Sequence, residues 1–550
     1  MVRRWGGLVG IIAVAVPYSR RVALTGAVAA VAILLAVAPT ASRAASCVTH
    51  WVGSWSASPS DASPLQPTLV DQTLRMIVAP HLGGSILRVH LSNRFGALPV
   101  TLGPVTVGVQ SSGPALVPGS ERAVTFNGQT SVTIPAGGDV VSDPVTLTFA
   151  AFQDLAVSIA VPGIVLSASE HQFTRQTSYL SPLLSGDHSA DTSGSAFTQT
   201  TTTSISTGWY FLDGIDVSAP GSVGAVVAFG DSITDGYEGI GPPSFAEDLS
   251  TIDTNGRYPD DLERRLIAAN IPLSVLNAGI GGDDLLASLS LHGQSALSRF
   301  AADALGQAGV TDVIVLEGIN DIAKGASASQ VIGADQQLIA EAHAAGVQIQ
   351  LGTLLPAGGL LLPTGEATGL SAADDAVRDQ VNQWIRTQHL SDGVIDFDAA
   401  IRDPNDPSQI NPAYADAADI HYSLAGYQAI ANAVPLDLLA RPQCGVTAPV
   451  ARVSVSALRR AAHARPRFRV RWSGTDSGGP GTAYFTVQVE TVAHRGNRRR
   501  APRWQNVRGF ARTTKRSLRF TGHVGVRYKF RVRAKDTSGL AGRWATTRTV

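Results

Sequence analysis

The chain of 550 residues is poor in charge, methionine and cysteine, with 16% charged residues, two Met and two Cys. Because 44% of its residues are hydrophobic, disorder, collagen and coiled coil are excluded as descriptions of the whole chain. Beyond the first 45 residues no apolar run is long enough to cross a membrane, so the mature chain is predicted to have no transmembrane span. No CxxC and no HExxH motif occurs, so neither a structural zinc site nor a zinc-protease site is predicted.

The formal charge of zero, from 43 basic and 43 acidic residues, conceals a strong asymmetry. Residues 451–550 contain 24 Arg and Lys against 3 Asp and Glu, so the acidic excess lies in residues 1–450. The basic segment lacks the motifs of nucleic-acid binding domains, and no nucleic-acid partner is predicted. In an exported chain this charge favours an anionic cell-envelope polymer as partner. The alternatives are simple solvation of the segment or pairing with the acidic remainder of the chain.

The first 45 residues have the pattern of a secretory signal peptide. They contain five Arg, no acidic residue, an apolar run from Val22 to Ala38, and small residues before an expected cleavage after residue 44 or 45. Ser19-Arg20-Arg21 resembles a twin-arginine signal. A secreted, extracellular protein is therefore predicted. A membrane anchor is the alternative, because a run of 17 residues approaches the shortest helix that spans a bilayer.

The two cysteines are Cys47, just after the expected cleavage site, and Cys444, just before the basic segment. An even number of cysteines in an exported chain favours a disulfide between them. Two free thiols are the alternative, because the sequence does not show how far apart the two Cα atoms lie.

Hydrophobic patterns divide the mature chain into three domains. Residues 46–217 alternate apolar and polar side chains, which predicts an all-β domain. In one of its strands Leu87, Val89 and Leu91 are expected to face the core, and the residues between them are expected to face outward. Residues 446–550 return to this alternation and predict a C-terminal β-sandwich.

Residues 218–445 have a different pattern, in which short apolar runs alternate with helical segments. This pattern predicts a parallel sheet covered by helices on both faces. Strands are expected at 225–229, 275–276, 313–316, 349–351 and 394–395, and helices at 258–269, 295–307, 329–345, 374–388 and 424–439.

Chemically active side chains follow these expected strands. Ser232 comes directly after the first strand, Gly282 lies in a glycine-rich turn after the second, Asn320 follows the third, and His421 precedes the last helix. Because parallel strands present their carboxyl ends at one edge of the sheet, we expect these residues to meet. A serine beside an imidazole base, with N–H donors for an oxyanion, suits nucleophilic catalysis. No GxSxG motif is present, which argues against an α/β-hydrolase.

These four blocks, in this order over about 190 residues, resemble the SGNH hydrolases of the GDSL esterase/lipase family. The resemblance implies a flavodoxin-like three-layer α/β/α domain that hydrolyses esters without a cofactor. It makes Ser232 the nucleophile and His421 the general base. The amides of Ser232 and Gly282 and the side chain of Asn320 become the oxyanion hole.

The flanking domains also resemble known types. The segment from Trp51 to Trp55 is similar to the start of exported members of the family that have an N-terminal β domain. The C-terminal segment resembles a fibronectin type III domain in the placement of Trp472 and Tyr528 and in its ending at Asp536 to Gly539.

The sequence departs from the family near the histidine. The acid of the family stands three residues before the histidine, where this chain has Ala418. Asp419 is predicted to orient His421 instead, with Asp416 or a backbone carbonyl, which would leave a dyad, as the alternatives. Tyr422 stands where a proline commonly follows the histidine.

The predicted function is that of a secreted serine esterase acting on acyl or acetyl esters of small molecules, carbohydrates or lipids. One alternative is a lipase or phospholipase that prefers longer acyl chains. The other is a non-catalytic envelope- or carbohydrate-binding protein whose SGNH domain has decayed. Asp283 and Asp284 are expected to be turn residues rather than metal ligands, and Glu317 and Asp321 to support Asn320.

Overall fold

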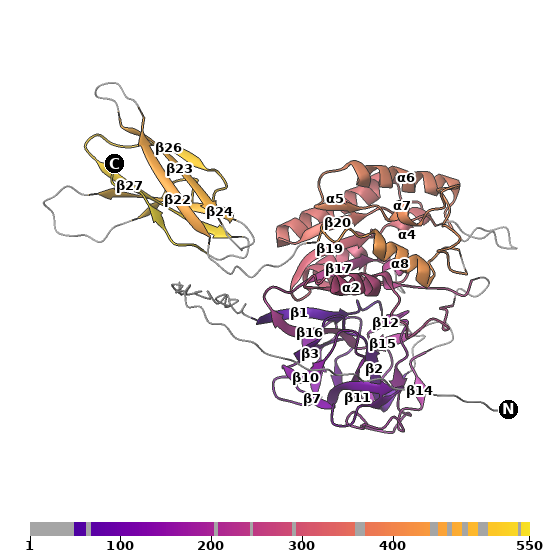
Figure 1. The fold of residues 1–550 in the computed structure, drawn as a ribbon. Helices are drawn as coiled ribbons and strands as arrows, with labels where there is room; N and C mark the ends of the chain where they lie inside the picture. Colours follow the sequence, from indigo (N-terminus) through magenta and orange to yellow (C-terminus); the bar gives the residue numbers. More distant parts are fainter. Residues whose placement is uncertain are drawn as a thin grey trace, which may run out of the picture. The chain divides into compact units, whose positions relative to one another are not determined.

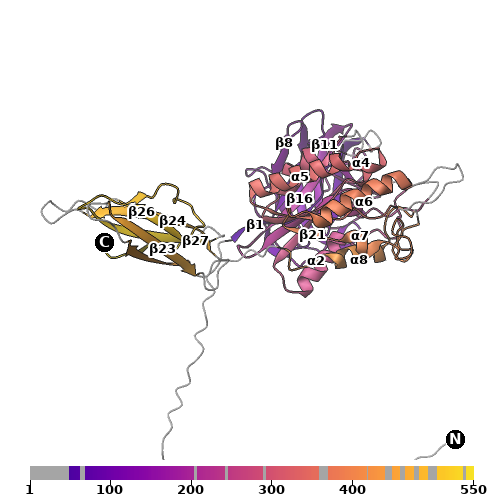
Figure 2. The ribbon, with the colours of Figure 1, turned by 90° about the horizontal axis from the view of Figure 1, so that it is seen from above.

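The structure is a computed structural model, which describes residues 49–61, 68–202, 207–241, 246–288, 293–357, 369–417, 419–439, 449–458, 465–475, 482–492, 504–536 and 541–550 (Figure 1 and Figure 2). The predicted signal peptide, Cys47, Cys444 and Ala418 lie outside these residues, so the predictions that concern them are untested. Among the described helices, none is long and apolar enough to span a bilayer.

The N-terminal domain is built from antiparallel strands. One sheet has the order β1-β16-β3-β10, with β9 on β3: β1 (Thr49–Ser56), β16 (Leu212–Pro220), β3 (Gly84–Ser92), β10 (Val145–Phe149) and β9 (Asp139–Val141). A second has the order β14-β13-β2-β11-β5-β6, with β7 on β5: β14 (Gln199–Thr200), β13 (Tyr179–Leu180), β2 (Leu69–Val78), β11 (Leu155–Val165), β5 (Val105–Ser112), β6 (Ala115–Leu116) and β7 (Arg122–Val124). Two short pairs complete the described strands: β12 (Glu170–Gln172) with β15 (Gly208–Tyr210), and β4 (Val100–Leu102) with β8 (Val132–Ile134).

The alternation in β3 has the predicted effect. Leu87, Val89 and Leu91 are fully buried in the core of this domain. The two residues between them face away from that core, but they are not free in solvent: Arg88 and His90 both bind Oδ2 of Asp216 on β16, at 2.7 and 2.8 Å.

The central domain contains the predicted parallel sheet, in the order β18-β17-β19-β20-β21. Numbered within the domain this order is 2-1-3-4-5, that of doubly wound flavodoxin-like sheets. The strands are β17 (Gly224–Gly230), β18 (Leu273–Gly279), β19 (Val310–Leu316), β20 (Gln348–Gly352) and β21 (Gly393–Ile395).

Helices cover both faces of this sheet, as predicted, and alternate residues of β17 point into two different cores. The described helical elements are α1 (Ser232–Asp235), α2 (Tyr258–Ala268), α3 (Ala296–Phe300), the π-helical η1 (Ala301–Leu305), α4 (Ile319–Ala323), α5 (Ala328–Ala345), α6 (Ala372–Thr387), α7 (Phe397–Ile401) and α8 (Leu424–Ala433). Val227 and Phe229 pack with α3, α5 and α6, whereas Val226 and Ala228 pack with α2, α7 and α8.

One helix ends earlier than the sequence pattern predicts. Helix α8 was expected to reach residue 439 but stops at Ala433. Pro435 is the reason, because a proline disfavours helical geometry in the residue before it, and Val434 is extended with ψ of 114°.

The β domain packs directly against the central domain through buried contacts. The N–H of Gly53 on β1 donates to the carbonyl of Ala308 at 2.8 Å, and a Cβ at Gly53 would lie 2.5 Å from Leu276. His81 reaches the carbonyl of Val275 and the carboxylate of Asp260, at 2.7 and 2.9 Å. Such polar contacts form only when the two domains pack against each other in one specific orientation.

The C-terminal segment forms two antiparallel sheets. They are β22-β23-β26 and β25-β24-β27-β28: β22 (Val450–Ala457), β23 (Arg467–Thr475), β26 (Ser517–Thr521), β25 (Gln505–Asn506), β24 (Thr482–Val492), β27 (Arg527–Asp536) and β28 (Ala545–Thr546). Arginines stack on its aromatic rings: the guanidinium of Arg531 lies 4.4 Å from the ring of Trp504 and 4.2 Å from that of Trp544. The fibronectin type III resemblance and the anionic partner stay predictions.

Candidate active site

The register of the parallel sheet brings three loops to one edge. Gly230, the last residue of β17, pairs with Gly279 at the end of β18 and with Leu316 at the end of β19. The segments that carry Ser232, Gly282 and Asn320 therefore start side by side. A Cβ at Gly230 would lie 2.2 Å from the carbonyl oxygen of Leu316, so only glycine permits this close approach.

Ser232 opens the short helix α1 directly after β17. The side chain of Asp231 caps this helix by accepting from the N–H of Ile233 at 2.9 Å. Ser232 is the first helical residue, so its own N–H has no acceptor within the helix. Its Oγ lies 2.9 Å from Nε2 of His421. The structure thus brings the predicted nucleophile and base together across 189 residues of sequence.

The loop before α8 presents His421 to Ser232. Asp416 and His421 close this loop, with the Asp416 N–H donating to the His421 carbonyl at 3.0 Å. The ring of Tyr237 packs edge-on against the imidazole, with centroids 4.7 Å apart. Burial lowers the pKa of His421 below its ordinary value of 6.5, against the charge of Asp416, which raises it. The imidazole is therefore neutral at neutral pH, as a general base must be.

The turn after β18 is held from two sides. Gly282 has φ of 76°, a left-handed conformation that glycine adopts without strain. Nδ2 of Asn320 donates to the carbonyl of Asp283 at 2.8 Å. Asp321 accepts the N–H groups of Leu285 and Leu286, at 2.7 and 3.0 Å, so it supports this turn rather than Asn320 itself. The predicted oxyanion donors Gly282 and Asn320 therefore belong to one connected unit.

The expected contact between Asp419 and His421 is not present in the structure. Asp419 has φ of 57°, and among the described residues its carboxylate makes no hydrogen bond to His421. Asp416 contacts the backbone of the histidine: its Oδ1 accepts the His421 N–H at 3.4 Å, and its Oδ2 accepts the Gly239 N–H at 2.9 Å. Nδ1 of His421 is buried without a hydrogen-bond partner in the described part of the chain. The acid that orients the imidazole thus remains a choice between Asp416, Asp419 and none.

Substituting Asp416 and Asp419 one at a time distinguishes their roles, because each role predicts a different effect on the pH profile of kcat/KM. Only neutral His421 can take a proton, so kcat/KM for an ester should fall at acid pH with a midpoint below the ordinary histidine value of 6.5. Asp416→Asn removes the charge that raises the pKa of His421, so the midpoint should move further toward acid. Asp419→Asn is the matched variant and should leave the midpoint in place. A shift caused by Asp419→Asn alone would instead make Asp419 the partner of His421.

A comparison with protein families matches this part of the chain. Residues 228–429 match the model of the GDSL-like Lipase/Acylhydrolase family. They form a GDSL-like acylhydrolase domain. This match confirms the predicted resemblance, and it makes the protein a hydrolase of ester substrates. A search of the curated proteins found no match to the sequence.

Several solved structures are similar to parts of this chain. An aryl esterase from M. smegmatis is 14% identical, with a TM-score of 0.30, and covers 38% of this chain and 96% of its own. A family two carbohydrate esterase from Clostridium thermocellum, in complex with cellohexaose, is 16% identical with a TM-score of 0.29 and covers 68% and 95%. A member of the lipolytic protein G-D-S-L family from Veillonella parvula is 18% identical with a TM-score of 0.26 and covers 38% and 94%. At these values they carry no conclusion about substrate.

Behind the catalytic edge of the GDSL domain, Arg299 holds the strand ends together. It is 1% exposed and donates to the carbonyls of Gly230 and Ala278, at 2.9 and 2.7 Å. Its Nε also binds Oδ2 of Asp283 at 2.7 Å. Burial lowers the pKa of Arg299, but Asp283, Asp303 and Glu317 raise it more, so the guanidinium stays charged. Burial and the neighbouring carboxylates in turn raise the pKa of Glu317 well above its ordinary value.

The acidic residues of the turn therefore have structural partners. Asp283 binds Arg299, and Asp284 binds Lys324 at 2.6 Å. Within the described ranges, no cluster of three or more His, Cys, Asp or Glu side chains is arranged to hold a metal ion. Sequence reasoning missed Arg299 because nothing in its local pattern distinguishes an arginine on the solvent side of a helix from one that points into the sheet.

Proposed function

We propose that this protein is a secreted serine esterase whose nucleophile is Ser232 and whose general base is His421. The distance of 2.9 Å between Ser232 Oγ and His421 Nε2, at the carboxyl edge of the parallel sheet, is the observation that supports this proposal most strongly. Secretion is supported by the sequence of the first 45 residues.

The geometry suits acyl transfer in two steps. Ser232 Oγ attacks the ester carbonyl while its proton passes to His421 Nε2, and the carbonyl oxygen becomes an oxyanion. The N–H groups of Ser232 and Gly282 and the amide of Asn320 are the donors that stabilise this charge. The imidazolium then protonates the departing alcohol, which leaves an acyl-enzyme. A water molecule, deprotonated by His421, releases the acid and restores Ser232.

The surroundings of Ser232 favour small acyl groups over long chains. Ser232 is 9% exposed, and the ring of Tyr237 covers one side of His421. Phe173 packs on Tyr237 in turn, with ring centroids 5.1 Å apart. Acetyl and other short acyl esters are therefore the proposed substrates, and esters of long acyl chains, as a lipase would take, are the alternative.

Hydrolysis of p-nitrophenyl esters by the purified full chain tests this function. We expect turnover of the acetate, a falling kcat/KM as the acyl chain is lengthened, and labelling of Ser232 by a serine-directed phosphonate, located by mass spectrometry. A kcat/KM that rises with chain length would support a lipase. If the chain neither hydrolyses these esters nor is labelled at Ser232, a binding protein with a decayed catalytic domain is the interpretation that is left.

A further inference from the structure

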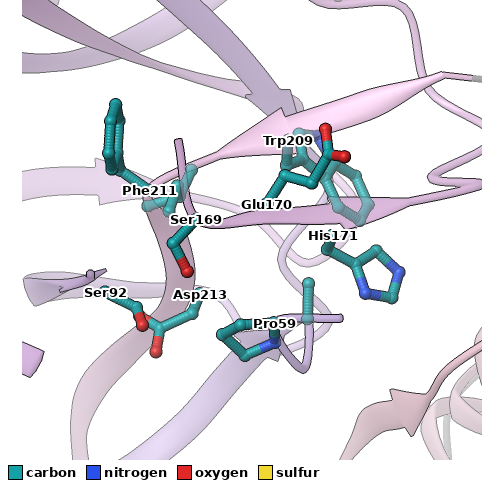
Figure 3. A pocket seen from close by; sticks show the side chains of 10 residues that line it. Pro59, Ser92, Ser169, Glu170, His171, Trp209, Phe211 and Asp213 are labelled. Carbon is teal, nitrogen blue, oxygen red and sulfur yellow. The ribbon is translucent and has the colours of Figure 1, made fainter. Parts of the chain in front are cut away.

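A buried histidine of the β domain reaches the loops of the GDSL domain. His171 lies on β12, where it is 4% exposed, stacks against Trp209 with centroids 5.8 Å apart, and borders the narrow pocket of Figure 3. Its Nδ1 lies 2.6 Å from the carbonyl oxygen of Ser58, and its Nε2 lies 3.0 Å from Oδ1 of Asp235. A carbonyl oxygen can only accept, so Nδ1 donates to Ser58, and the contact between Nε2 and Asp235 is a hydrogen bond when one proton lies between these two atoms.

Asp235 connects this histidine to the oxyanion turn. It is the last residue of α1, three positions after Ser232, and its Oδ2 accepts the N–H of Gly281 at 3.0 Å. Gly281 directly precedes Gly282. The N–H of Gly281 belongs to the peptide between Ile280 and Gly281, so its bond to Asp235 holds the peptide next to the one that carries the Gly282 N–H. The direction of the Gly282 N–H is then restricted through the backbone of Gly281.

The same segment of the β domain also covers the turn with an aromatic ring. A Cβ at Gly281 would lie 2.8 Å from Cδ2 of Phe173, so the ring packs directly on this glycine. Phe173 and Arg175 have φ of 58° and 52°, and such backbone conformations in non-glycine residues cluster at functional sites. Arg175 holds the segment in place through Oε2 of Glu238, at 2.8 Å.

We propose that His171 is a positioning residue of the esterase, which acts through Asp235 to hold the turn of Gly281 and Gly282 ready for the oxyanion. The β domain is then a working part of the active site rather than a separate module. This inference rests on the proposed function of Ser232. A misplaced oxyanion donor weakens binding of the transition state more than binding of the substrate, so its signature is a lower kcat with an unchanged KM.

The chain offers a matched control in His81, a second buried histidine that joins the two domains. It is also 4% exposed, and its ring nitrogens likewise face a carbonyl oxygen and a carboxylate, those of Val275 and Asp260. None of the described hydrogen bonds of His81 reaches the turn at 280–284. His171→Gln and His81→Gln therefore remove comparable interdomain contacts, but only the first touches the path to Gly282.

The test measures kcat and KM for p-nitrophenyl acetate on the full chain, with rates divided by the fraction of Ser232 that a phosphonate labels. His171→Gln should lower kcat by about 10- to 100-fold with KM unchanged, less than the loss from deleting an oxyanion donor. His81→Gln should stay within about threefold of the wild type, because it leaves the donors in place. Asp235→Ala, which removes the contacts to both His171 and Gly281, should lower kcat at least as much as His171→Gln. The double variant should be no slower than the slower single variant, since both act through one contact.

Two results would overturn the inference. The first is that His171→Gln and His81→Gln have the same kcat per labelled Ser232. The second is that the uncorrected rate of His171→Gln falls only in proportion to its labelled fraction, which would mean that fewer molecules are folded rather than that each one is slower. If His171→Gln does not fold, Asp235→Ala alone decides, and an unchanged kcat in that variant overturns the inference. A wild-type chain without esterase activity would overturn the proposed function as well.

Discussion

Replacing Ser232 by alanine is expected to reduce kcat for p-nitrophenyl acetate by about 10⁴- to 10⁶-fold, and His421→Ala should cost a similar factor. Without its hydroxyl the enzyme cannot form an acyl-enzyme, and without the imidazole at 2.9 Å the hydroxyl keeps its proton. The double variant should be no slower than either single variant, because the two side chains carry out one step together. Steady-state release of p-nitrophenol is the measurement.

Ser274→Ala is the control for this pair. Ser274 is a fully buried serine of β18, and among the described residues its Oγ has no hydrogen-bond partner. This variant should keep the wild-type rate, since it removes a hydroxyl but nothing at the carboxyl edge of the sheet. If Ser232→Ala retained a substantial share of the wild-type rate, another residue would have to be the nucleophile.

The substitution Arg299→Met should destabilise the fold by about 3–5 kcal/mol, the usual cost of leaving buried charges unpaired. Methionine nearly matches the arginine in length but donates no hydrogen bond to Gly230, Ala278 or Asp283. Asp283 and Glu317 would then be buried without their cation, and both must be protonated for the chain to fold. Urea unfolding followed by tryptophan fluorescence measures the change as a lower transition midpoint.

A more exposed arginine is the control for this effect. Arg402 has a side chain that is 39% exposed and binds Asp398, which also keeps Arg378 as a partner. Arg402→Met should therefore cost no more than about 1 kcal/mol. If the urea transition midpoint fell equally in both variants, Arg299 would not stabilise the strand ends more than an exposed arginine stabilises its own surroundings. If Arg299→Met does not fold at all, Arg299→Lys, which keeps the charge but loses the planar fork, should give a smaller, measurable loss.

The positions of Ser232, Gly282, Asn320 and His421 were accessible from the sequence for a physical reason. Each follows or precedes an element whose hydrophobic pattern is local, and parallel strands necessarily place their carboxyl ends at one edge. Once the strands were located, the meeting of these residues followed from topology. The same local reasoning placed the core residues of β3, since alternation alone tells the two faces of a strand apart.

The acid near His421 could not be decided in this way. Spacing along a chain predicts direction only in regular structure, and this loop contains a left-handed residue at Asp419 that breaks the regularity. The end of α8 was misplaced for a related reason, because the effect of Pro435 outweighed a hydrophobic pattern that continued past it.

The sequence by itself thus determined the parallel sheet of the central domain and the reaction class, and it supplied the four residues proposed for the candidate site. Only the tertiary structure decided that Arg299 ties the strand ends together and that His171 reaches Asp235 from another domain, 64 residues away. Such contacts depend on how elements pack against one another. Hydrophobic periodicity indicates which face of an element is buried, but it does not indicate which polar group of another element a buried side chain will bind.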